Sequence, residues 1–257
     1  MSQISVVVHG LGNIGRHVIQ SLETAPDMRC LGVVRRAASL GTQAADLRGL
    51  PDFADLDSLV AAQGKPDAAI LCGPSRSVPE DARRYLAAGL HTVDSFDIHD
   101  RVPELVADLQ SAAANAGRVA VTAAGWDPGT DSALRALFEA MAPVGVTFTN
   151  FGRGRSMGHS VAARSIKGVA DATSITIPIG GGRHSRLVYV LLDKGADFET
   201  VRLAISKDPY FTKDPLEVRE ARTQAELDAV CDASHGVTME RVGASGLTSN
   251  QHLKFDM

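Results

Sequence analysis

The chain has 257 residues, 44% of them hydrophobic, and a formal net charge of −4. This composition can fill one large core or two modest ones, and it excludes a disordered chain. The charges form no basic stripe, and we find neither a leader nor a membrane-length apolar run, so we expect a cytoplasmic protein that binds neither nucleic acid nor membrane. The three cysteines, Cys30, Cys72 and Cys231, are far apart and predict reduced thiols, without a disulfide or a zinc site.

The first half of the chain alternates predicted strands and helices. Apolar, β-branched runs predict strands at 4–8, 30–34, 68–72, 91–93 and 119–122. Helices are expected at 13–22, 56–62, 79–89 and 103–116. This alternation predicts an α/β fold with a Rossmann-type doubly wound parallel sheet, in a nucleotide-binding domain of residues 1–123.

The pattern changes in the second half. A helix at 131–141 is followed by predicted strands at 146–151, 173–179, 187–192, 237–241 and 252–257. Only two further helices are expected, at 199–205 and 224–230. Strands in runs with few helices predict a second α+β domain, residues 124–257, with a mixed or antiparallel sheet.

A glycine motif lies between the first strand and the first helix. Gly10, Gly12 and Gly15 have the G-x-G-x-x-G spacing, in which the glycines allow a tight turn, close approach of a pyrophosphate, and helix–strand packing. A turn formed by the glycines alone is the alternative. The strand, turn, helix and second strand in this order favour a dinucleotide site.

The second strand ends in Arg35 and Arg36, where an NAD-binding protein usually carries an acid for the ribose 2′-hydroxyl. Two guanidinium groups suit a 2′-phosphate, so the sequence predicts NADP. The turn from Gly73 to Arg76 follows another strand of the same sheet and is expected to border the cofactor.

Two acidic residues follow successive later strands. Asp97 and Asp127 are expected where the nicotinamide end of a cofactor faces the substrate, and there they could hold an ammonium or accept a proton. Helix caps or turn formers are the alternative interpretation. Trp126, the only tryptophan, is expected to be a wall against a flat substrate or the nicotinamide.

The second domain contains a glycine- and arginine-rich loop at 151–160, which could either contact a carboxylate or be a solvated turn. Thr176, Arg183, Arg186 and His235 follow it, and His235 is a candidate carboxylate contact. His9, His17, His91 and His252 are interpreted as ordinary polar residues. We recognise no metal-ligand motif and no serine–histidine–aspartate motif.

Several of these segments together resemble the meso-diaminopimelate dehydrogenase family. They are HTVDSFDIH at 91–99, GWDPGTDS at 125–132, NFG at 150–152, SMGHS at 156–160 and HGVTMER at 235–241. The resemblance extends from residue 4 to residue 257. It implies reversible, NADP-dependent oxidative deamination of the D-centre of meso-2,6-diaminopimelate to L-2-amino-6-oxopimelate and ammonia, by a homodimer or higher homo-oligomer.

The resemblance also implies site residues. Asp97 and Asp127 would hold the reacting amino group beside Trp126, and the Met157–Gly158 backbone would lie near the D-centre carboxylate. Phe151, Thr176, Arg186 and His235 would surround the distal L-centre. The residues that would line NADP are Gly10, Leu11, Gly12, Asn13, Ile14, Gly15, Arg35, Arg36, Cys72, Gly73, Pro74, Ser75, Ser95, Phe96, Ala124, Gly125 and Pro128.

Family chains continue beyond the position of Met257 with an asparagine-containing turn and a helix that returns to the nucleotide domain. We expect a form without this tail to be less stable or to self-associate. Two other functions stay open from the sequence: an NADP-binding sensor or inactive paralogue, and a related NADP-dependent reductase acting on a cyclic imine or a sugar-like substrate.

Overall fold

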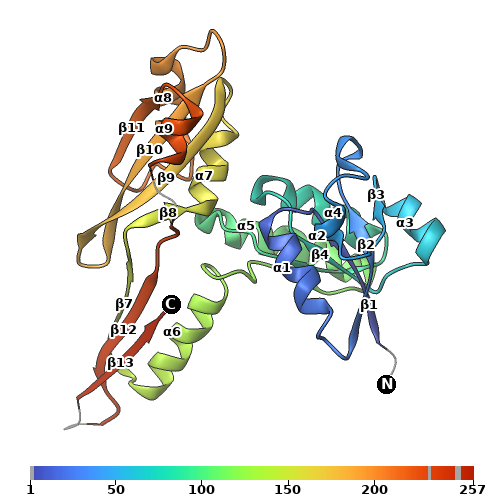
Figure 1. Ribbon diagram of the computed structural model, residues 1–257. Coiled ribbons are helices and arrows are strands. Elements are labelled where there is room, and N and C mark those ends of the chain that lie inside the picture. Colours follow the sequence, from blue (N-terminus) through green and yellow to red (C-terminus); the bar gives the residue numbers. More distant parts are fainter. Residues whose placement is uncertain (1–2, 231–232, 247–249) are drawn as a thin grey trace. The chain divides into compact units, whose positions relative to one another are not determined.

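The computed structural model describes residues 3–230, 233–246 and 250–257, and Cys231 lies outside these ranges. The chain divides into two compact units, Met1–Ser132 (unit 1) and Ala133–Met257 (unit 2), which are described separately (Figure 1). No helix in the described ranges is long and apolar enough to cross a membrane.

Unit 1 contains one six-stranded parallel sheet in the order β3-β2-β1-β4-β5-β6. This is the strand order of the dinucleotide-binding Rossmann fold, as the sequence predicts. The strands are β1 (Ile4–His9), β2 (Met28–Val34), β3 (Asp52–Phe53), β4 (Ala68–Leu71), β5 (His91–Asp94) and β6 (Ala120–Val121). The helices are α1 (Asn13–Leu22), α2 (Ala44–Leu47), α3 (Leu56–Gln63), α4 (Val78–Ala87) and α5 (Val102–Ala116).

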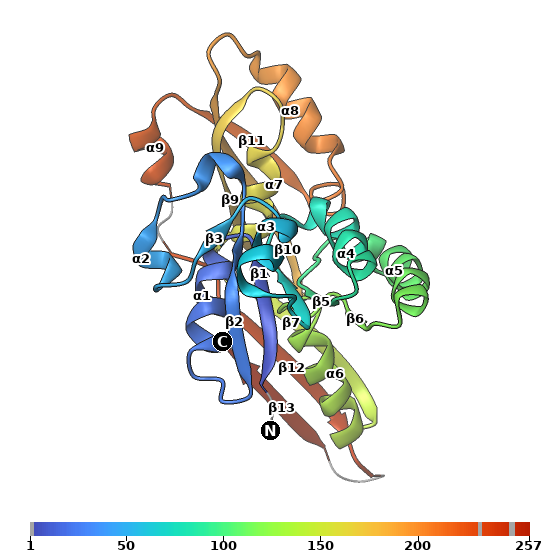
Figure 2. The ribbon, with the colours of Figure 1, turned by 90° about the vertical axis from the view of Figure 1, so that its right-hand side faces the viewer.

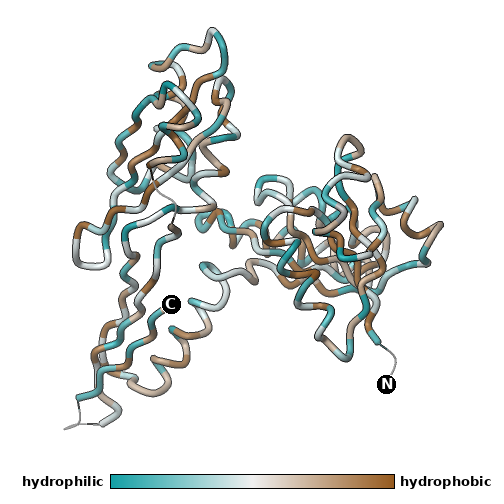
Figure 3. Tube along the Cα trace, viewed as in Figure 1, coloured by the Kyte–Doolittle hydropathy of each residue, from teal (hydrophilic) through white to brown (hydrophobic). Residues whose placement is uncertain are grey.

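The core of unit 1 forms where β1 is covered on both faces. Val6, Val7 and Val8 are all buried, as expected for an inner strand of a parallel sheet. Ile19 of α1 packs in one cluster with Val8 and Cys72. Hydrophobic residues gather in the interior of the unit, and hydrophilic ones are frequent on its outer turns (Figure 3).

The loop after β6 belongs to unit 1, so the division observed at Ser132 lies beyond the expected boundary after residue 123. Hydrogen bonds to β5 hold the start of this loop. The Ala124 N–H donates to the Asp94 carbonyl at 2.8 Å, and the Ala123 N–H donates to the Asp94 carboxylate at 3.0 Å.

Unit 2 contains two sheets, and their mixed and antiparallel pairing is as the sequence predicts. The four-stranded sheet has the order β11-β10-β9-β8, with β10 parallel to β11 and antiparallel to β9. The three-stranded sheet, β13-β12-β7, is antiparallel. The strands are β7 (Val144–Phe151), β8 (Gly154–Ser156), β9 (Val169–Gly180), β10 (Arg183–Leu192), β11 (Leu216–Ala221), β12 (Val237–Ala244) and β13 (Gln251–Asp256).

Helices cover one face of each sheet in unit 2. They are α6 (Thr130–Met141, its first residues in unit 1), α7 (Met157–Arg164), α8 (Phe198–Lys207) and α9 (Gln224–Asp228). Helices α7 and α8 pack on the four-stranded sheet through a cluster that includes Ala163, Val188 and Ile205. Helix α6 lies along the three-stranded sheet, where Arg135 donates to Thr149 of β7 (Figure 2).

The expectation of only two helices after residue 141 is wrong, as is the expected loop at 151–160. Residues 154–156 form β8, and α7 begins at Met157. A tertiary contact stabilises this segment: the Ser160 hydroxyl, which donates to the Ser156 carbonyl at 2.6 Å, also accepts from the Ser174 N–H of β9 at 2.9 Å. Strand β11 is a further element that the sequence pattern did not predict.

Candidate active site

The glycine turn of unit 1 has the geometry that a nucleotide pyrophosphate requires. Gly10 has φ +98°, and a side chain on it would lie 3.1 Å from the Cys72 backbone. A Cβ on Gly15 would lie 2.1 Å from the Gly10 carbonyl oxygen, so only glycine lets α1 pack this closely on the turn. A Cβ on Gly12 would meet no heavy atom within 4 Å, which leaves the space for a ligand open.

Helix α1 begins at this turn. Gly12 is its N-cap, without a side-chain hydrogen bond, and the next residues, Asn13 and Ile14, are exposed, whereas Leu11 is half-buried. The first N–H groups of a helix have no partner within the helix and carry a partial positive charge, which suits a phosphate.

The two arginines at the end of β2 lie in different environments. The Arg35 side chain is 4% exposed, and it donates through Nε to the Asp52 carboxylate at 2.8 Å and through a terminal nitrogen to the Thr42 carbonyl at 2.6 Å. The hydrogen bond from Arg35 holds the pKa of Asp52 below its ordinary value. Arg36 is exposed. Arg35 therefore stabilises the loop that follows β2, and Arg36 is the exposed cation of the pair.

The turn after β4 packs against the glycine turn and reaches an acidic residue. Burial raises the pKa of the Cys72 thiol to about 12, so this thiol is neutral at physiological pH. Pro74 precedes the short 3₁₀ turn Ser75–Ser77, and Gly73 lies beside the His9 ring. The Ser75 hydroxyl donates to Asp97 Oδ1 at 2.6 Å, so the structure brings together a residue expected at the cofactor and one expected at the reacting amine.

A buried carboxylate, Asp94, connects the ends of β5 and β6. Its side chain accepts the N–H groups of Phe96 and Ala123, both at 3.0 Å, and the Thr122 hydroxyl at 2.7 Å. Ala123 has φ +55°, a strained left-handed conformation for alanine that surrounding contacts must hold in place. Asp94 thus fixes the backbone on both sides of Ser95 and of the loop that begins at Ala124.

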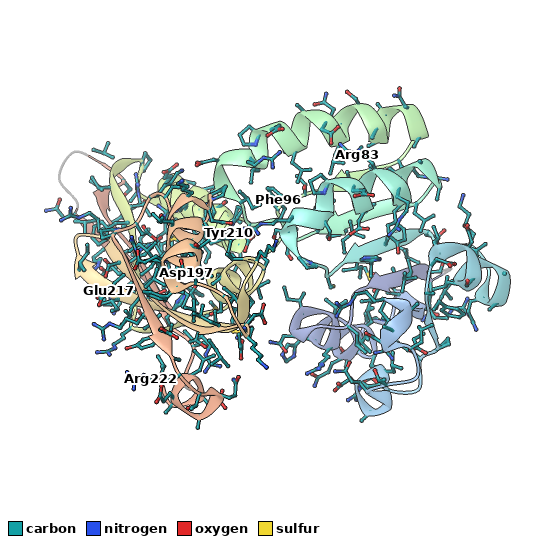
Figure 4. All side chains as sticks on the ribbon, turned by 90° about the horizontal axis from the view of Figure 1, so that it is seen from above. Arg83, Phe96, Asp197, Tyr210, Glu217 and Arg222 are labelled. Atoms are coloured by element: carbon teal, nitrogen blue, oxygen red, sulfur yellow. The ribbon has the colours of Figure 1, made fainter. Side chains whose placement is uncertain are left out.

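Phe96 follows β5 (Figure 4), and the residue is only 2% exposed. Its side chain is therefore part of the core. Any cofactor contact at this position is left to the exposed edges of its neighbours, since Ser95 and Asp97 are each half-buried.

The loop that carries Trp126 and Asp127 is a compact turn. A Cβ on Gly129 would lie 2.2 Å from the Gly125 carbonyl oxygen, and the Asp131 N–H donates to the Trp126 carbonyl at 2.8 Å. The peptide between Asp127 and Pro128 is cis. The Asp127 side chain is 30% exposed, and its Oδ1 lies 3.9 Å from His99 Nε2. His99 was not singled out as a site residue.

In unit 2, four of the expected substrate residues form one cluster. The Phe151 ring is edge-on to His235, with centroids 5.3 Å apart, and to His184 at 5.4 Å. Arg186, 8% exposed, donates to the Thr176 hydroxyl at 2.5 Å. One terminal nitrogen of Arg186 lies 2.7 Å from His184 Nε2, so His184 links the two pairs. Burial lowers the pKa of both histidines.

Asp214 completes this cluster and was not predicted. Its Oδ2 accepts from Arg186 Nε at 2.8 Å and lies 3.0 Å from His184 Nε2. Arg183, which directly precedes His184 on β10, is exposed.

Met157 and Gly158 form the first turn of α7. The Ser156 hydroxyl contacts His159 Nδ1 at 3.0 Å and does not cap the helix. The N–H groups of this turn thus lie at the N-terminus of a helix that has no side-chain cap. A carboxylate is stabilised at such a position.

Comparisons with known proteins agree with this arrangement. Residues 4–94 match the oxidoreductase family with an NAD-binding Rossmann fold, and residues 125–181 match the diaminopimelic acid dehydrogenase C-terminal domain. Over its whole length the chain is 46% identical to the meso-diaminopimelate D-dehydrogenase of Bacteroides fragilis, of which it covers 83%. The chain belongs to the meso-diaminopimelate D-dehydrogenase family.

Solved structures of related proteins have the same fold. An engineered D-amino acid dehydrogenase bound to NADP⁺ gives a TM-score of 0.85 at 28% identity, and the comparison covers 100% of this chain and 83% of that one. The Corynebacterium glutamicum DAP dehydrogenase in complex with DAP gives 0.81 at 31% identity, with the same coverage. The fold and the family expected from the sequence are thereby confirmed.

The sequence analysis missed two residues of the cluster in unit 2, His184 and Asp214. His184 lies two positions before Arg186 on β10, and alternate residues of a strand share a face, but the predicted strand begins at Leu187 and so leaves both residues outside it. Asp214 is 28 residues away from Arg186, on a loop without a recognisable pattern.

Proposed function

We propose that this chain is an NADP-dependent dehydrogenase that oxidatively deaminates the D-centre of meso-2,6-diaminopimelate. The observation that carries the proposal is the distribution of charge: two carboxylates, Asp97 and Asp127, follow β5 and β6 of the dinucleotide-binding unit, and a buried guanidinium, Arg186, lies in unit 2. The proposed substrate has an ammonium and a carboxylate at each end and needs contacts of both signs.

The residues around the glycine turn fit NADP. Gly12 leaves open space at the start of α1, and exposed Arg36 supplies a cation at the end of β2 for a 2′-phosphate. When bound, NADP⁺ supplies the hydride acceptor for the reaction.

Asp97 and Asp127 are proposed to bind the reacting amino group and to take up its proton. The Ser75 hydroxyl orients the Asp97 carboxylate, and the compact turn from Gly125 to Gly129 positions Asp127 next to Trp126. Loss of hydride from the D-centre carbon leaves an imine, and water replaces its nitrogen. The overall reaction consumes water and releases L-2-amino-6-oxopimelate, ammonium, NADPH and one proton.

The residues of unit 2 are proposed to bind the carboxylates. The N–H groups of Met157 and Gly158 suit the D-centre carboxylate, since they open an uncapped helix. Phe151, Thr176, Arg186 and His235 suit the distal L-centre. Here Arg186 offers charge, and the neutral rings enclose the aliphatic part of the substrate.

The test is NADPH formation from NADP⁺ with meso-diaminopimelate, compared with D-alanine and with the LL isomer, which lacks a D-centre. We expect turnover of meso-diaminopimelate alone or by a wide margin. Equal turnover of D-alanine would contradict distal recognition, and absence of NADPH would refute the proposed activity.

We also propose a homodimer. Apolar side chains of unit 2 are exposed on the three-stranded sheet and α6, with Val144 73%, Val146 64% and Leu137 58% exposed, and burial in an interface would remove them from water. Light scattering after gel filtration tests this. The cytoplasmic location stays a prediction from the sequence.

A further inference from the structure

The ion pair of Asp214 with Arg186 is mostly withdrawn from water. The side chain of Arg186 is 8% exposed, that of His184 17% and that of Asp214 20%. Taking both charges out of water costs free energy that their attraction recovers only with good geometry and further hydrogen bonds. A pair of this kind in a cluster of expected substrate residues calls for a functional explanation.

The side chains of this cluster cannot satisfy all of one another's hydrogen-bonding groups. His184 Nε2 lies 2.7 Å from an Arg186 nitrogen and 3.0 Å from Asp214 Oδ2. A ring nitrogen can accept from the guanidinium or donate to the carboxylate, and it cannot do both. His184 Nδ1 is buried and has no hydrogen-bond partner among the described residues. An anion bound to the terminal nitrogens of Arg186 would release Nε2 to donate to Asp214.

The charges of the cluster balance. Burial lowers the pKa of His184 and of His235, so both rings are neutral, and one guanidinium faces one carboxylate. An amino acid centre carries one ammonium and one carboxylate, and it can form an ion pair with each side chain. A ligand end with a carboxylate alone would place that anion near Asp214 without compensation.

We propose that Asp214 is a specificity-determining residue, which binds the ammonium of the amino acid centre whose carboxylate contacts Arg186. Both contacts of Asp214 within the described residues use Oδ2, so Oδ1 can accept a hydrogen bond from the ligand. This inference rests on the proposed function, because it assigns the distal L-centre of meso-diaminopimelate to the cluster.

The experiment compares two substrates that differ only in the distal amino group: meso-diaminopimelate and D-2-aminopimelate. The variants are Asp214→Asn and, as a matched control, Asp171→Asn, which removes a carboxylate from another arginine pair of unit 2, Arg164–Asp171. The kcat and KM of each substrate, thermal unfolding and the Kd of NADPH are measured for every protein.

We expect the wild type and Asp171→Asn to prefer meso-diaminopimelate by the same ratio of kcat/KM. In Asp214→Asn that ratio should fall by about tenfold or more, through a raised KM for meso-diaminopimelate, because one charge-assisted hydrogen bond is lost. The Kd of NADPH should stay unchanged. If Asp214→Asn unfolds, Asp214→Glu, which keeps the charge but moves it, should give a smaller fall in the ratio.

Three outcomes would overturn the inference. The first is a wild type that shows no preference between the two substrates. The second is an Asp214→Asn, or a folded Asp214→Glu in its place, with an unchanged ratio. The third is an equal loss for both substrates, which would mean that Asp214 only positions Arg186. Absence of any NADPH formation with meso-diaminopimelate in the wild type would refute the proposed function as well, and so differs from these results.

Discussion

We expect Arg35 and Arg36, which follow β2, to affect cofactor binding in different ways. Replacement of exposed Arg36 by alanine should remove a contact to the 2′-phosphate without disturbing the fold. A hydrogen bond to a charged group contributes about 1.5–3 kcal/mol, which corresponds to a rise of about 10- to 150-fold in the Kd of NADPH. The Kd of NADH, which lacks the 2′-phosphate, should stay unchanged.

Replacement of Arg35 by alanine should act on stability instead. The Arg35 side chain is 4% exposed and its partner Asp52 16%, so the variant leaves a largely buried carboxylate without its cation. Breaking such a pair costs about 3–5 kcal/mol, and we expect the lower end because Asp52 keeps some contact with water. The loop from Thr42 back to Arg35 also loses a hydrogen bond, so both cofactors should bind less well.

Fluorescence titration with NADPH and NADH, together with thermal unfolding, separates the two effects. Arg36→Ala should change only the NADPH Kd, and Arg35→Ala should lower Tm and weaken both cofactors. A contrary result would be that both variants bind NADPH more weakly, bind NADH as the wild type does, and keep the wild-type Tm. Arg35 would then contact the phosphate and not Asp52, and our interpretation of the two arginines would be wrong.

Three further predictions concern other parts of the chain. Gly15→Ala should abolish NADPH binding in titrations, because its Cβ would lie 2.1 Å from the Gly10 carbonyl oxygen; near-normal affinity would contradict this. Asp94→Ala should lower kcat by about 100-fold by misplacing the catalytic loops, whereas Asp94→Asn, which can still bond Thr122 and accept both N–H groups, should keep most of it; equal losses would refute this role. Burial lowers the pKa of His159 from 6.5 to about 3, so stability should be full above pH 6.5 and fall towards pH 3, by up to about 1.4 kcal/mol per pH unit. In urea unfolding, His159→Gln should reduce this fall, and an unchanged pH dependence would count against it.

The sequence predicted well those elements whose local pattern also determines their packing. Helix α1 has the predicted bounds because the glycine motif sets its start and the helix buries an apolar face. Two of the three glycines have a steric reason: Gly15 packs on the Gly10 carbonyl within the turn, and Gly10 packs on the Cys72 backbone, whereas Gly12 faces open space. Strand β10 begins earlier than predicted, because its polar residues from Arg183 to Arg186 pair with β9 next to the hairpin turn.

The sequence did not predict α7. Its segment, SMGHSVAARS, contains glycine and serine, which are common in loops. Ser160 and Ala163 are nevertheless buried, and the helix is stabilised by tertiary contacts: His159 is edge-on to Tyr210 and Phe211 (Figure 4 labels Tyr210), from a part of the chain about 50 residues later. Helical propensity in a short window contains no information on such partners.

The carboxylates missed at the site share one property. Asp52, Asp94 and Asp214 are each bonded to a group 17 to 29 residues away, so no local spacing points to them. Each also acts on a neighbour that the sequence did identify: Asp52 withdraws Arg35 from the solvent, Asp94 fixes the backbone beside Asp97 and Ala124, and Asp214 balances the charge of Arg186. A sequence motif can therefore identify the side chains that contact a ligand. The net charge around these side chains and their positions depend on carboxylates that are distant in the sequence and lie beside them only in the folded chain. At Arg186, the presence of Asp214 decides whether the cluster suits a carboxylate alone or an amino acid centre with both its carboxylate and its ammonium.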